Sequence, residues 1–359
     1  MHQNFYFSAI SVKFVTMITE IKDYNLKERN TFGMDVHCHR LIGYTLPQDV
    51  PQVLRMLKPG EKWFHLGGGS NILFTGDYDG TILLNLGHNF TIYETGNWIY
   101  PPGTIFADAG AALDDVIAAA CEKGLWGIEN LSGIPGTIGG AAVQNVGAYG
   151  QEIGNSILQL LVYDTVESCQ CVILGNECHY GYRHSMFKES ENEGRYIILS
   201  VMLGLSPEPH PMLDYGNLRT VVGDTTPLTP EVMRDAVIQT RRSKLPEPAE
   251  TGSAGSFFKN PVLTADQFAE FSTRVGLNDF PRFSLPDGTF KIPAAWLIDQ
   301  AGWKGYNDGN AAVWHKQPLV LVNATGKASP TEILSLEHKI IDSVKEKFGI
   351  ELVPEVIHI

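Results

Sequence analysis

Residues 132–150 read SGIPGTIGGAAVQNVGAYG, a stretch with six glycines, one proline and no Asp, Glu, Lys or Arg. Because glycine has no Cβ and tolerates positive φ, backbone N–H groups in such a stretch can approach a ligand closely. Successive N–H groups that turn inward form a concave site for an anion such as a phosphate or pyrophosphate. The alternative interpretation is a helix of small residues that packs closely on a neighbour. A second glycine turn at residues 67–71, GGGSN, follows an apolar stretch and favours the ligand site.

Neither glycine stretch matches a common nucleotide-binding fingerprint. Gly133, Gly136 and Gly139 are spaced by three, which differs from G-x-G-x-x-G, and no G-x-x-x-x-G-K-[ST] occurs. The sequence therefore argues against both the Rossmann fold and the P-loop fold.

Length and charge restrict the possible functions. A chain of 359 residues is suited to two or three domains. No apolar run approaches the ~20 residues of a membrane-spanning helix, so we expect no membrane partner. The net charge of −13 argues against binding to nucleic acid. An anionic substrate would be repelled at long range, so its site must contain local cations or backbone donors.

Cysteine and histidine patterns do not indicate a metal site. Five cysteines are an odd and sparse set, which is typical of reduced thiols in a cytoplasmic protein. Cys169, Cys171, Cys178 and His179 lie close in sequence, but their C-x-C spacing is outside the usual zinc pattern. The pair His37 and His39 is expected on one side of a strand, in contact with solvent. The first residues lack a basic leading region and a cleavage site, so residues 1–17 are expected to be a disordered extension.

The hydrophobic pattern predicts a mixture of strands and helices. Strands are predicted at 37–46, 63–67, 81–86, 105–110, 158–163, 171–174, 196–205, 319–323 and 351–357. Helices are predicted at 47–57, 113–125, 230–242 and 294–300, with two more starting at capping residues Thr264 and Ser329. The main domain boundary is predicted in the proline-rich residues 244–252.

Several separated segments carry specific patterns. They are NTFG at 30–33, GYRHSMFK at 181–188, RRSKLP at 241–246, GSAGSFFKNP at 252–261, AWLIDQ at 295–300 and PEV at 354–356. Their order and spacing resemble the type I UDP-N-acetylenolpyruvoylglucosamine reductase family from about residue 21 to the end. The two glycine stretches resemble the flavin-binding part of the vanillyl-alcohol-oxidase type of FAD domain.

This resemblance implies an α+β fold. It would contain a two-part FAD-binding region of the vanillyl-alcohol-oxidase (PCMH) type and a C-terminal α+β substrate-binding domain. The expected division is 18–97 and 98–245 for the two FAD-binding subdomains and 246–349 for the substrate-binding domain, with 350–359 joining the second subdomain. The resemblance also implies non-covalent FAD, NADPH as co-substrate, a sugar-nucleotide substrate and a cytoplasmic monomer.

The family reduces an enolpyruvyl ether on UDP-N-acetylglucosamine by way of FAD. Hydride addition leaves negative charge next to the substrate carboxylate, and a planar guanidinium suits that carboxylate. By the resemblance this guanidinium belongs to Arg183, Ser256 donates the proton to the carbanion, and Glu355 orients or polarises the intermediate. Serine is a weak acid, so its role would depend on its position.

The resemblance also implies residues that bind the ligands. Those for the cofactor are Gly67, Gly68, Gly69, Ser70, Asn71, Ile134, Pro135, Gly136, Gly139, Gly140, Asn145, Gly147, Ala148 and Tyr149. Those for the substrate are Tyr149, Tyr215, Lys244, Asn260 and Gln300. Lys244 would supply charge to the diphosphate, and Tyr215 lies in a segment similar to the mobile loop of type I members. Ile357 stands where some members have an arginine, and His358 is a candidate to replace that contact.

Two other functions remain open at the level of sequence. The first is an FAD oxidase of the same flavin fold that acts on an alcohol or a lactone; such enzymes often attach flavin through histidine, and His65 precedes the glycine turn. The second is a non-catalytic protein that binds a sugar nucleotide. Ser256 and Lys244 have no obvious use in the oxidase.

Overall fold

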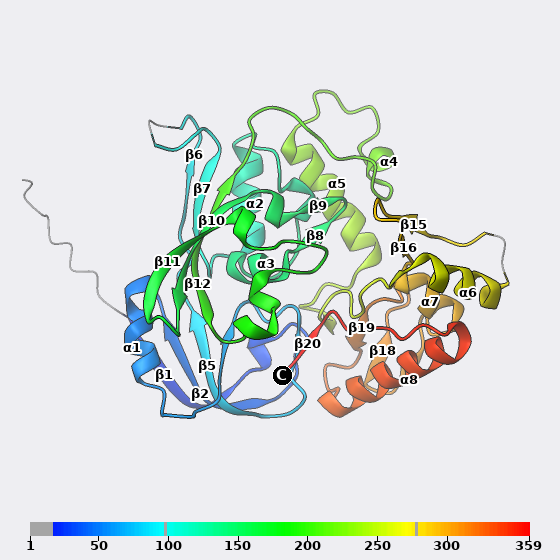
Figure 1. The fold of residues 1–359 in the computed structure, drawn as a ribbon, viewed down its shortest axis with the longest axis horizontal. Helices are drawn as coiled ribbons and strands as arrows, with labels where there is room; N and C mark the ends of the chain where they lie inside the picture. Colours follow the sequence, from blue (N-terminus) through cyan, green and yellow to red (C-terminus); the bar gives the residue numbers. More distant parts are fainter. Residues whose placement is uncertain (1–16, 97–98, 277–278) are drawn as a thin grey trace, which may run out of the picture.

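The computed structural model describes residues 17–96, 99–276 and 279–359 (Figure 1). The expected extension at 1–17 therefore lies almost wholly outside the described residues. The described chain forms three regions around a common centre, seen in Figure 1 as blue, green and yellow-to-red lobes. Within the described residues no helix is both long and apolar enough to cross a membrane.

The first region is a four-stranded sheet in the order β1-β2-β5-β3. Its strands are β1 (Thr19–Asn25), β2 (His37–Tyr44), β5 (Tyr78–Asn85) and β3 (Trp63–Leu66). β2 and β3 both pair with β5 in parallel, whereas β1 pairs with β2 antiparallel. A short 3-10 turn (Pro47–Asp49) and helix α1 (Val50–Arg55) replace the single helix predicted at 47–57, because Pro51 has no N–H to donate to the carbonyl four residues earlier.

The second region is a five-stranded antiparallel sheet in the order β11-β10-β12-β7-β6. Its strands are β11 (Cys169–Leu174), β10 (Ile157–Asp164), β12 (Tyr196–Gly204), β7 (Thr104–Asp108) and β6 (Phe90–Tyr93). Helices α2 (Leu113–Glu122), α3 (Ile138–Gln144), α4 (Leu218–Val222) and α5 (Pro230–Lys244) accompany it, as does the short hairpin of β8 (Gly147–Ala148) and β9 (Gln151–Glu152). The apolar residues of α2 at helical spacing are buried, as predicted.

The third region consists of two small sheets and three helices. The sheets are β13 (Gly252–Ser253), β19 (Leu321–Asn323), β18 (Ala311–Val313) and β17 (Asn307–Asp308), and β14 (Val262–Leu263), β16 (Phe290–Lys291) and β15 (Phe283–Ser284). The helices are α6 (Ala265–Val275), α7 (Ala294–Gln300) and α8 (Pro330–Phe348). The capping boxes predicted at Thr264 and Ser329 are both present.

The end of the chain returns to the first region. β20 (Ile357–His358) pairs in parallel with β4 (Ile72–Leu73), so the last residues are in contact with the first region. The strand predicted at 351–357 is wrong over most of its length. Pro354 has no N–H to donate, and this segment instead forms an isolated bridge with Phe258. The last residues of the chain therefore run along the centre of the molecule.

One hydrophobic core connects the first and third regions. Phe32 and Phe74 of the first region belong to the same buried cluster as Phe257, Leu297 and Ile340 of the third. Phe32 and Phe257 meet edge to face with centroids 6.2 Å apart. The first and third regions therefore share one buried apolar core.

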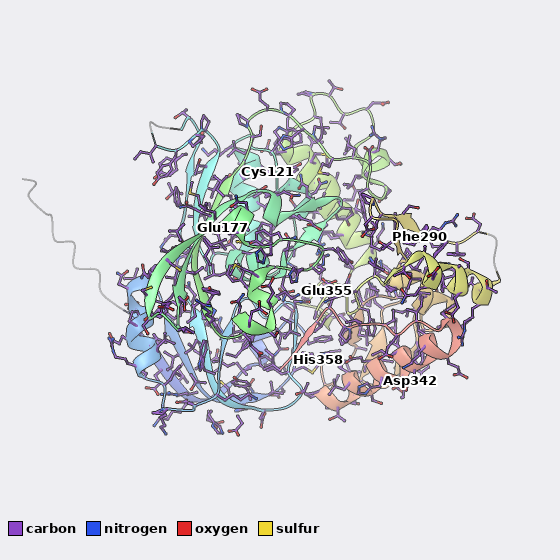
Figure 2. All side chains as sticks on the ribbon, viewed as in Figure 1. Cys121, Glu177, Phe290, Asp342, Glu355 and His358 are labelled. Atoms are coloured by element: carbon purple, nitrogen blue, oxygen red, sulfur yellow. The ribbon has the colours of Figure 1, made fainter. Side chains whose placement is uncertain are left out.

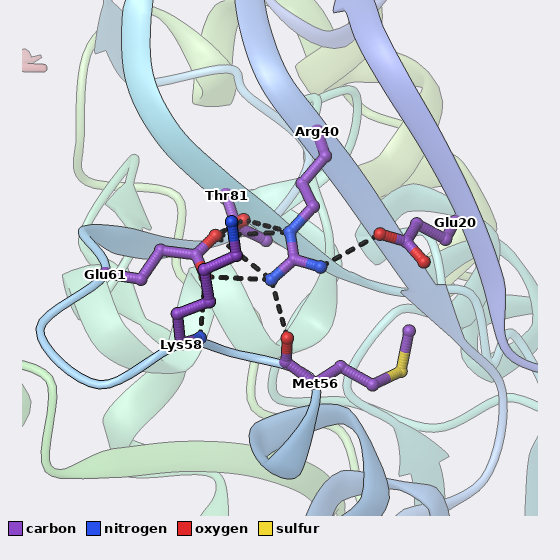
Figure 3. Close-up of polar contacts among 6 residues, drawn as sticks. All are labelled: Glu20, Arg40, Met56, Lys58, Glu61 and Thr81. Carbon is purple, nitrogen blue, oxygen red and sulfur yellow. Dashed lines mark hydrogen bonds and ion pairs between the residues drawn. The ribbon is translucent and has the colours of Figure 1, made fainter.

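Polar contacts also tie the first sheet to its neighbouring loop (Figure 3). The guanidinium of Arg40 on β2 donates to both carboxylate oxygens of Glu61 at 2.9–3.0 Å, to the Thr81 hydroxyl at 2.7 Å and to the Glu20 carboxylate at 2.9 Å. Its fourth acceptor is the carbonyl of Met56 at 2.7 Å. One side chain therefore joins β1, β2, β5 and the loop that leads to β3.

Candidate active site

A cavity of about 1310 Å³ lies where the three regions meet. Typical sites for one small ligand measure roughly 300–1,000 Å³, so this cavity has room for a dinucleotide and a second molecule. Of the residues expected to bind cofactor or substrate, it is lined by Gly67, Gly68, Gly69, Ser70, Asn71, Ile134, Pro135, Gly136, Gly139, Gly140, Gly147, Ala148, Tyr149, Tyr215, Lys244 and Asn260. The three expected catalytic residues, Arg183, Ser256 and Glu355, also line it.

The two glycine stretches face each other across one wall of the cavity. A Cβ on Gly68 would lie 2.5 Å from the Cα of Gly136, which is closer than real atoms approach. Gly136 has φ +121°, a conformation that glycine adopts readily. The Ser70 hydroxyl donates to the Pro135 carbonyl at 2.9 Å and holds the two loops together. Only glycine permits this contact.

These loops present unused main-chain donors. Within the described residues, the N–H groups of Gly68, Gly69, Ser70, Gly136 and Thr137 have no protein acceptor. Such N–H groups can bind a phosphate oxygen without a cationic side chain.

Residues 132–150 contain both a loop and a closely packed helix. Residues 132–137 form the loop, and α3 follows as a short helix of small residues. A Cβ on Gly139 would lie 2.8 Å from the Cβ of Ala109, so α3 does pack closely on its neighbour. Asn145 does not line the cavity and is fully buried. Its amide donates to Glu152 at 2.9 Å and to the Gly181 carbonyl at 2.8 Å, which indicates a structural role.

Arg183 and Glu355 form an ion pair inside the cavity. Arg183 Nε donates to Glu355 Oε1 at 2.6 Å, and the side chains are 19% and 13% exposed. Arg183 Nη2 donates to the carbonyl of Gly147 at 2.8 Å. Because a guanidinium has five N–H donors, donors remain for a ligand. Figure 2 shows Glu355 near the centre of the molecule, between the second and third regions.

The backbone connects Ser256 to Glu355. The N–H of Glu355 donates to the carbonyl of Phe257 at 2.8 Å, and the N–H of Lys259 donates to the carbonyl of Val353 at 2.9 Å. These bonds place the Ser256 segment alongside the C-terminal segment. Gly255 precedes Ser256 with φ +71°, a turn that exposes the serine to the cavity. Arg183, Ser256 and Glu355 thus come from three distant segments to one site.

Further polar residues surround this group. Asn260 donates its amide to the Tyr182 hydroxyl at 3.3 Å, which connects the third region to the second. Burial raises the pKa of Tyr182, and the charge of Glu355 adds to this effect. Lys188 donates to Gln144 Oε1 at 2.7 Å, and burial together with the Lys259 charge lowers the pKa of Lys188 to about 8.

Two more cations line the cavity, and one of them, Arg241, lies beside a glycine loop. Burial lowers the pKa of Arg241, and its guanidinium lies beside Gly133, where a Cβ would be 3.4 Å from Arg241 Nε. The backbone carbonyl of Lys244, the last residue of α5, accepts a hydrogen bond from the indole N–H of Trp314 at 3.0 Å. An acidic protein thus keeps positive charge where an anion would bind.

Two expected contacts are not found. Gln300 is the last residue of α7, where its side chain is exposed, and it does not line the cavity. His358 does not replace the missing arginine, since its Nε2 lies 2.8 Å from Glu337 Oε2 on α8. Ile357 itself lines the cavity.

Comparisons with known proteins match both halves of the chain. A family model for the UDP-N-acetylenolpyruvoylglucosamine reductase C-terminal domain matches residues 247–359, and one for an FAD binding domain matches residues 43–169. The chain is 38% identical over 334 residues to the UDP-N-acetylenolpyruvoylglucosamine reductase of Bacteroides fragilis, which covers 93% of this chain and 98% of that protein. It is 40% identical over 333 residues to the reductase of Pseudomonas putida, with 91% and 95% covered. The chain belongs to the UDP-N-acetylenolpyruvoylglucosamine reductase family.

A solved structure shares the fold of this reductase. The crystal structure of the enzyme from Thermus caldophilus matches with a TM-score of 0.64 at 21% identity, and covers 96% of this chain and 99% of that one. The predicted fold class is confirmed as an α+β protein with an FAD-binding domain followed by the C-terminal domain of the reductase family. The reductase is an FAD-dependent oxidoreductase.

Family membership argues against the oxidase alternative. The family match spans almost the whole chain, including the Ser256 and Lys244 segments that an oxidase would not need. His65 is in contact with Tyr44, whose hydroxyl lies 2.8 Å from His65 Nε2. Burial lowers the pKa of His65 to about 4, so its imidazole is neutral at physiological pH.

Cavity residues that the sequence reasoning did not assign include Tyr182, Lys188 and Arg241. All three lie inside the segments GYRHSMFK and RRSKLP, so the sequence pattern indicated these segments but not the role of each residue.

Among the described residues, no group of three His, Cys, Asp or Glu side chains is arranged to hold a metal ion. All five cysteines are free thiols; Cys169 is exposed and Cys178 is buried.

Proposed function

We propose that this reductase converts the enolpyruvyl ether of UDP-N-acetylglucosamine to UDP-N-acetylmuramate, with NADPH as the source of reducing equivalents and FAD as the cofactor, in peptidoglycan precursor synthesis. The observation that carries the proposal is the Arg183–Glu355 pair, which lines the cavity together with Ser256. A guanidinium, a carboxylate and a hydroxyl together suit a reaction that forms and then protonates an enolate.

The glycine loops fit the diphosphate of FAD. A Cβ at Gly68 or Gly136 would fill the space between the loops, and the N–H groups of Gly68–Ser70 and Gly136–Thr137 are available as donors. Arg241, close to Gly133, would add positive charge. When bound, FAD would carry the hydride from NADPH to the substrate.

Arg183 binds the substrate carboxylate in this proposal. Nε is used by Glu355 and Nη2 by the carbonyl of Gly147, so Nη1 and the second N–H of Nη2 remain for the ligand. As hydride addition proceeds, negative charge moves onto the carboxylate and the carbon beside it. A donor that is already in place stabilises this charge without reorganisation, and deletion of such a donor costs roughly 3–4 kcal/mol.

Ser256 then delivers a proton to the carbon next to the carboxylate. The Glu355 N–H bond to the Phe257 carbonyl and the Gly255 turn hold the serine at the cavity wall. Arg183 and Glu355 are mostly withdrawn from solvent, with side chains 19% and 13% exposed, and they line the same cavity as the serine. Position rather than acidity therefore makes serine an effective donor here.

Lys244 and Tyr215 bind the nucleotide in this proposal. Lys244 lines the cavity and would neutralise the diphosphate, which the net charge of −13 would otherwise repel. Tyr215 is half exposed in the 211–218 loop, where its ring can cover a bound nucleotide.

Anaerobic titration of the purified protein tests the proposal. NADPH should bleach the flavin absorbance, and the enolpyruvyl sugar nucleotide should restore it with one UDP-N-acetylmuramate formed per flavin. Acid precipitation should release the flavin into the supernatant. A protein without flavin, or reduced flavin that the sugar nucleotide leaves unchanged, would rule the proposal out.

A further inference from the structure

Residues 181–188 dock on the C-terminal end of α3 through side chains from both partners. Ser185 Oγ donates to the carbonyl of Val143 at 2.6 Å, and Lys188 Nζ donates to Gln144 Oε1 at 2.7 Å. From the other side, the Asn145 amide donates to the Gly181 carbonyl at 2.8 Å. The spacing of the segment GYRHSMFK thus places Arg183 at a tip, with its anchors two and five residues later.

Arg183 occupies an unusual backbone conformation at this tip. The N–H and carbonyl groups of Gly181 and His184 bond to each other at 3.0 and 3.2 Å, which closes a tight turn. Within it Arg183 has φ +53°, in the left-handed region. A residue other than glycine persists in this strained conformation only where its surroundings hold it.

Lys188 makes the contact that holds this conformation. Its ammonium donates to the carbonyl of Arg183 at 3.0 Å as well as to Gln144. We propose that Lys188 is a positioning residue, whose ammonium fixes the orientation of the Arg183 peptide and so directs the guanidinium toward Glu355. This inference rests on the proposed function, because its effect is measured through Arg183.

The surroundings of Lys188 do not resemble those of a lysine placed for stability. Within the described residues, Lys188 has no carboxylate at ion-pair distance, and both of its acceptors are neutral oxygens. Burial of a cation without a counter-ion is costly. The groups that act on its charge are Lys259 and Arg183, which disfavour it, and Glu355, which favours it. A lysine in these surroundings does not stabilise the fold, and its hydrogen bond to the Arg183 carbonyl is the better explanation for its presence.

A double-mutant cycle tests whether Lys188 acts through Arg183. Lys188→Met should lower kcat with the enolpyruvyl sugar nucleotide about 10- to 100-fold when Arg183 is present, the size of effect expected from a small misplacement of a catalytic group. In an Arg183→Ala background the same change should cost less than about threefold. An equal loss in both backgrounds, or no loss in either, would overturn the inference.

Further variants and measurements distinguish a positioning role of Lys188 from a general loss of folding. Lys188→Arg, which keeps a cation and donors, should recover much of the rate, and Lys339→Met on the surface of α8 should leave it unchanged. Amide exchange over residues 181–187 should be faster in Lys188→Met, while flavin content and the thermal midpoint stay close to those of the wild type. Unchanged exchange there would contradict the inference even if the rate fell.

The pH profile gives an independent test. Because the pKa of Lys188 is about 8, its ammonium is charged below this pH and neutral above it. The rate of the step with sugar nucleotide should therefore fall above about pH 8 in the wild type, and this limb should move to higher pH in Lys188→Arg. A limb that stays in place would contradict the inference. If instead the wild type does not reduce the sugar nucleotide at all, the proposed function has failed and not this inference.

Discussion

Arg183 and Glu355 lie 172 residues apart in sequence, yet Arg183 Nε and Glu355 Oε1 are 2.6 Å apart. The arginine comes from a turn of the second region and the glutamate from the segment that follows α8. Burial of such a pair costs desolvation energy that its mutual attraction offsets only when the geometry is good. The pair is thus better explained by the chemistry of the cavity than by stability.

Glu355→Gln should lower turnover roughly 100- to 1,000-fold, the range found when a preorganised polar group is removed. The amide can still accept from Arg183, so the geometry should persist while the negative charge is lost. Single-turnover oxidation of the reduced flavin by the sugar nucleotide measures the effect. Flavin content should match the wild type, and a rate within about threefold of the wild type would argue against a catalytic role.

Ser256→Ala should remove the proton donor and slow product formation by roughly 100- to 10,000-fold. Flavin reduction by NADPH, which needs no proton from this serine, should stay within about twofold. Ser284→Ala, an exposed serine on β15, is the matched control. Equal slowing of both half-reactions would indicate a structural role for Ser256.

Gly68→Ala should impair FAD binding, because its Cβ would lie 2.5 Å from the Cα of Gly136 and separate the two loops. Gly76→Ala is the matched control, since a Cβ there meets nothing within 4 Å. Overpacking of this kind costs about 1–3 kcal/mol, or roughly 5- to 150-fold in the FAD dissociation constant if it falls wholly on the bound state. Equilibrium dialysis against FAD measures it, and equal affinities in the two variants would exclude the glycine loops as the FAD site.

Arg40→Met should destabilise the first region, because Glu61 would lose its charged partner in a mostly buried site. Their side chains are 14% and 17% exposed, so the loss should be on the order of 3 kcal/mol, near the lower end for a broken buried pair. The thermal midpoint followed by circular dichroism measures it. Lys62→Met, an exposed lysine on the same loop, should change the midpoint little.

The contribution of Glu61 should also depend on pH. Burial alone would raise the pKa of Glu61, but hydrogen bonds from the Lys58 N–H, Thr81 and Arg40 hold it below its usual value. Stability from a lowered carboxyl pKa is present above the unfolded value of about 4.3 and is lost as the pH falls through the folded value. The midpoint difference between the wild type and Glu61→Gln should therefore be full at pH 7 and shrink below about pH 4. A difference that does not change with pH would contradict this account.

Local sequence was sufficient for most helices and for most of the longer strands, whereas β1 and many of the shortest strands were not predicted. The apolar spacing of α2 and the capping boxes of α6 and α8 depend on neighbours within a few residues, and each is present where predicted. The last strand was predicted too long, because Pro354 cannot donate to a ladder and its partner, Phe258, is distant in sequence.

The cavity residues were predictable as segments but not as individual contacts. Lys188 and Arg241 belong to recognisable patterns, yet their roles depend on what lies opposite them. Gln300 illustrates the converse, since it matches a family pattern but lies outside the cavity. A pattern carries residue identity, whereas a contact depends on the path of the whole chain.

The sequence alone determined the glycine loops, because a close approach of two backbones requires residues without Cβ atoms and composition records this directly. It also determined the helices, whose signals are local. Only the tertiary structure decided that Arg183 meets Glu355, that Lys188 holds the Arg183 carbonyl, and that the last strand returns to β4. These contacts join distant segments, and their positions follow from the packing of three regions on shared cores, which no local pattern encodes.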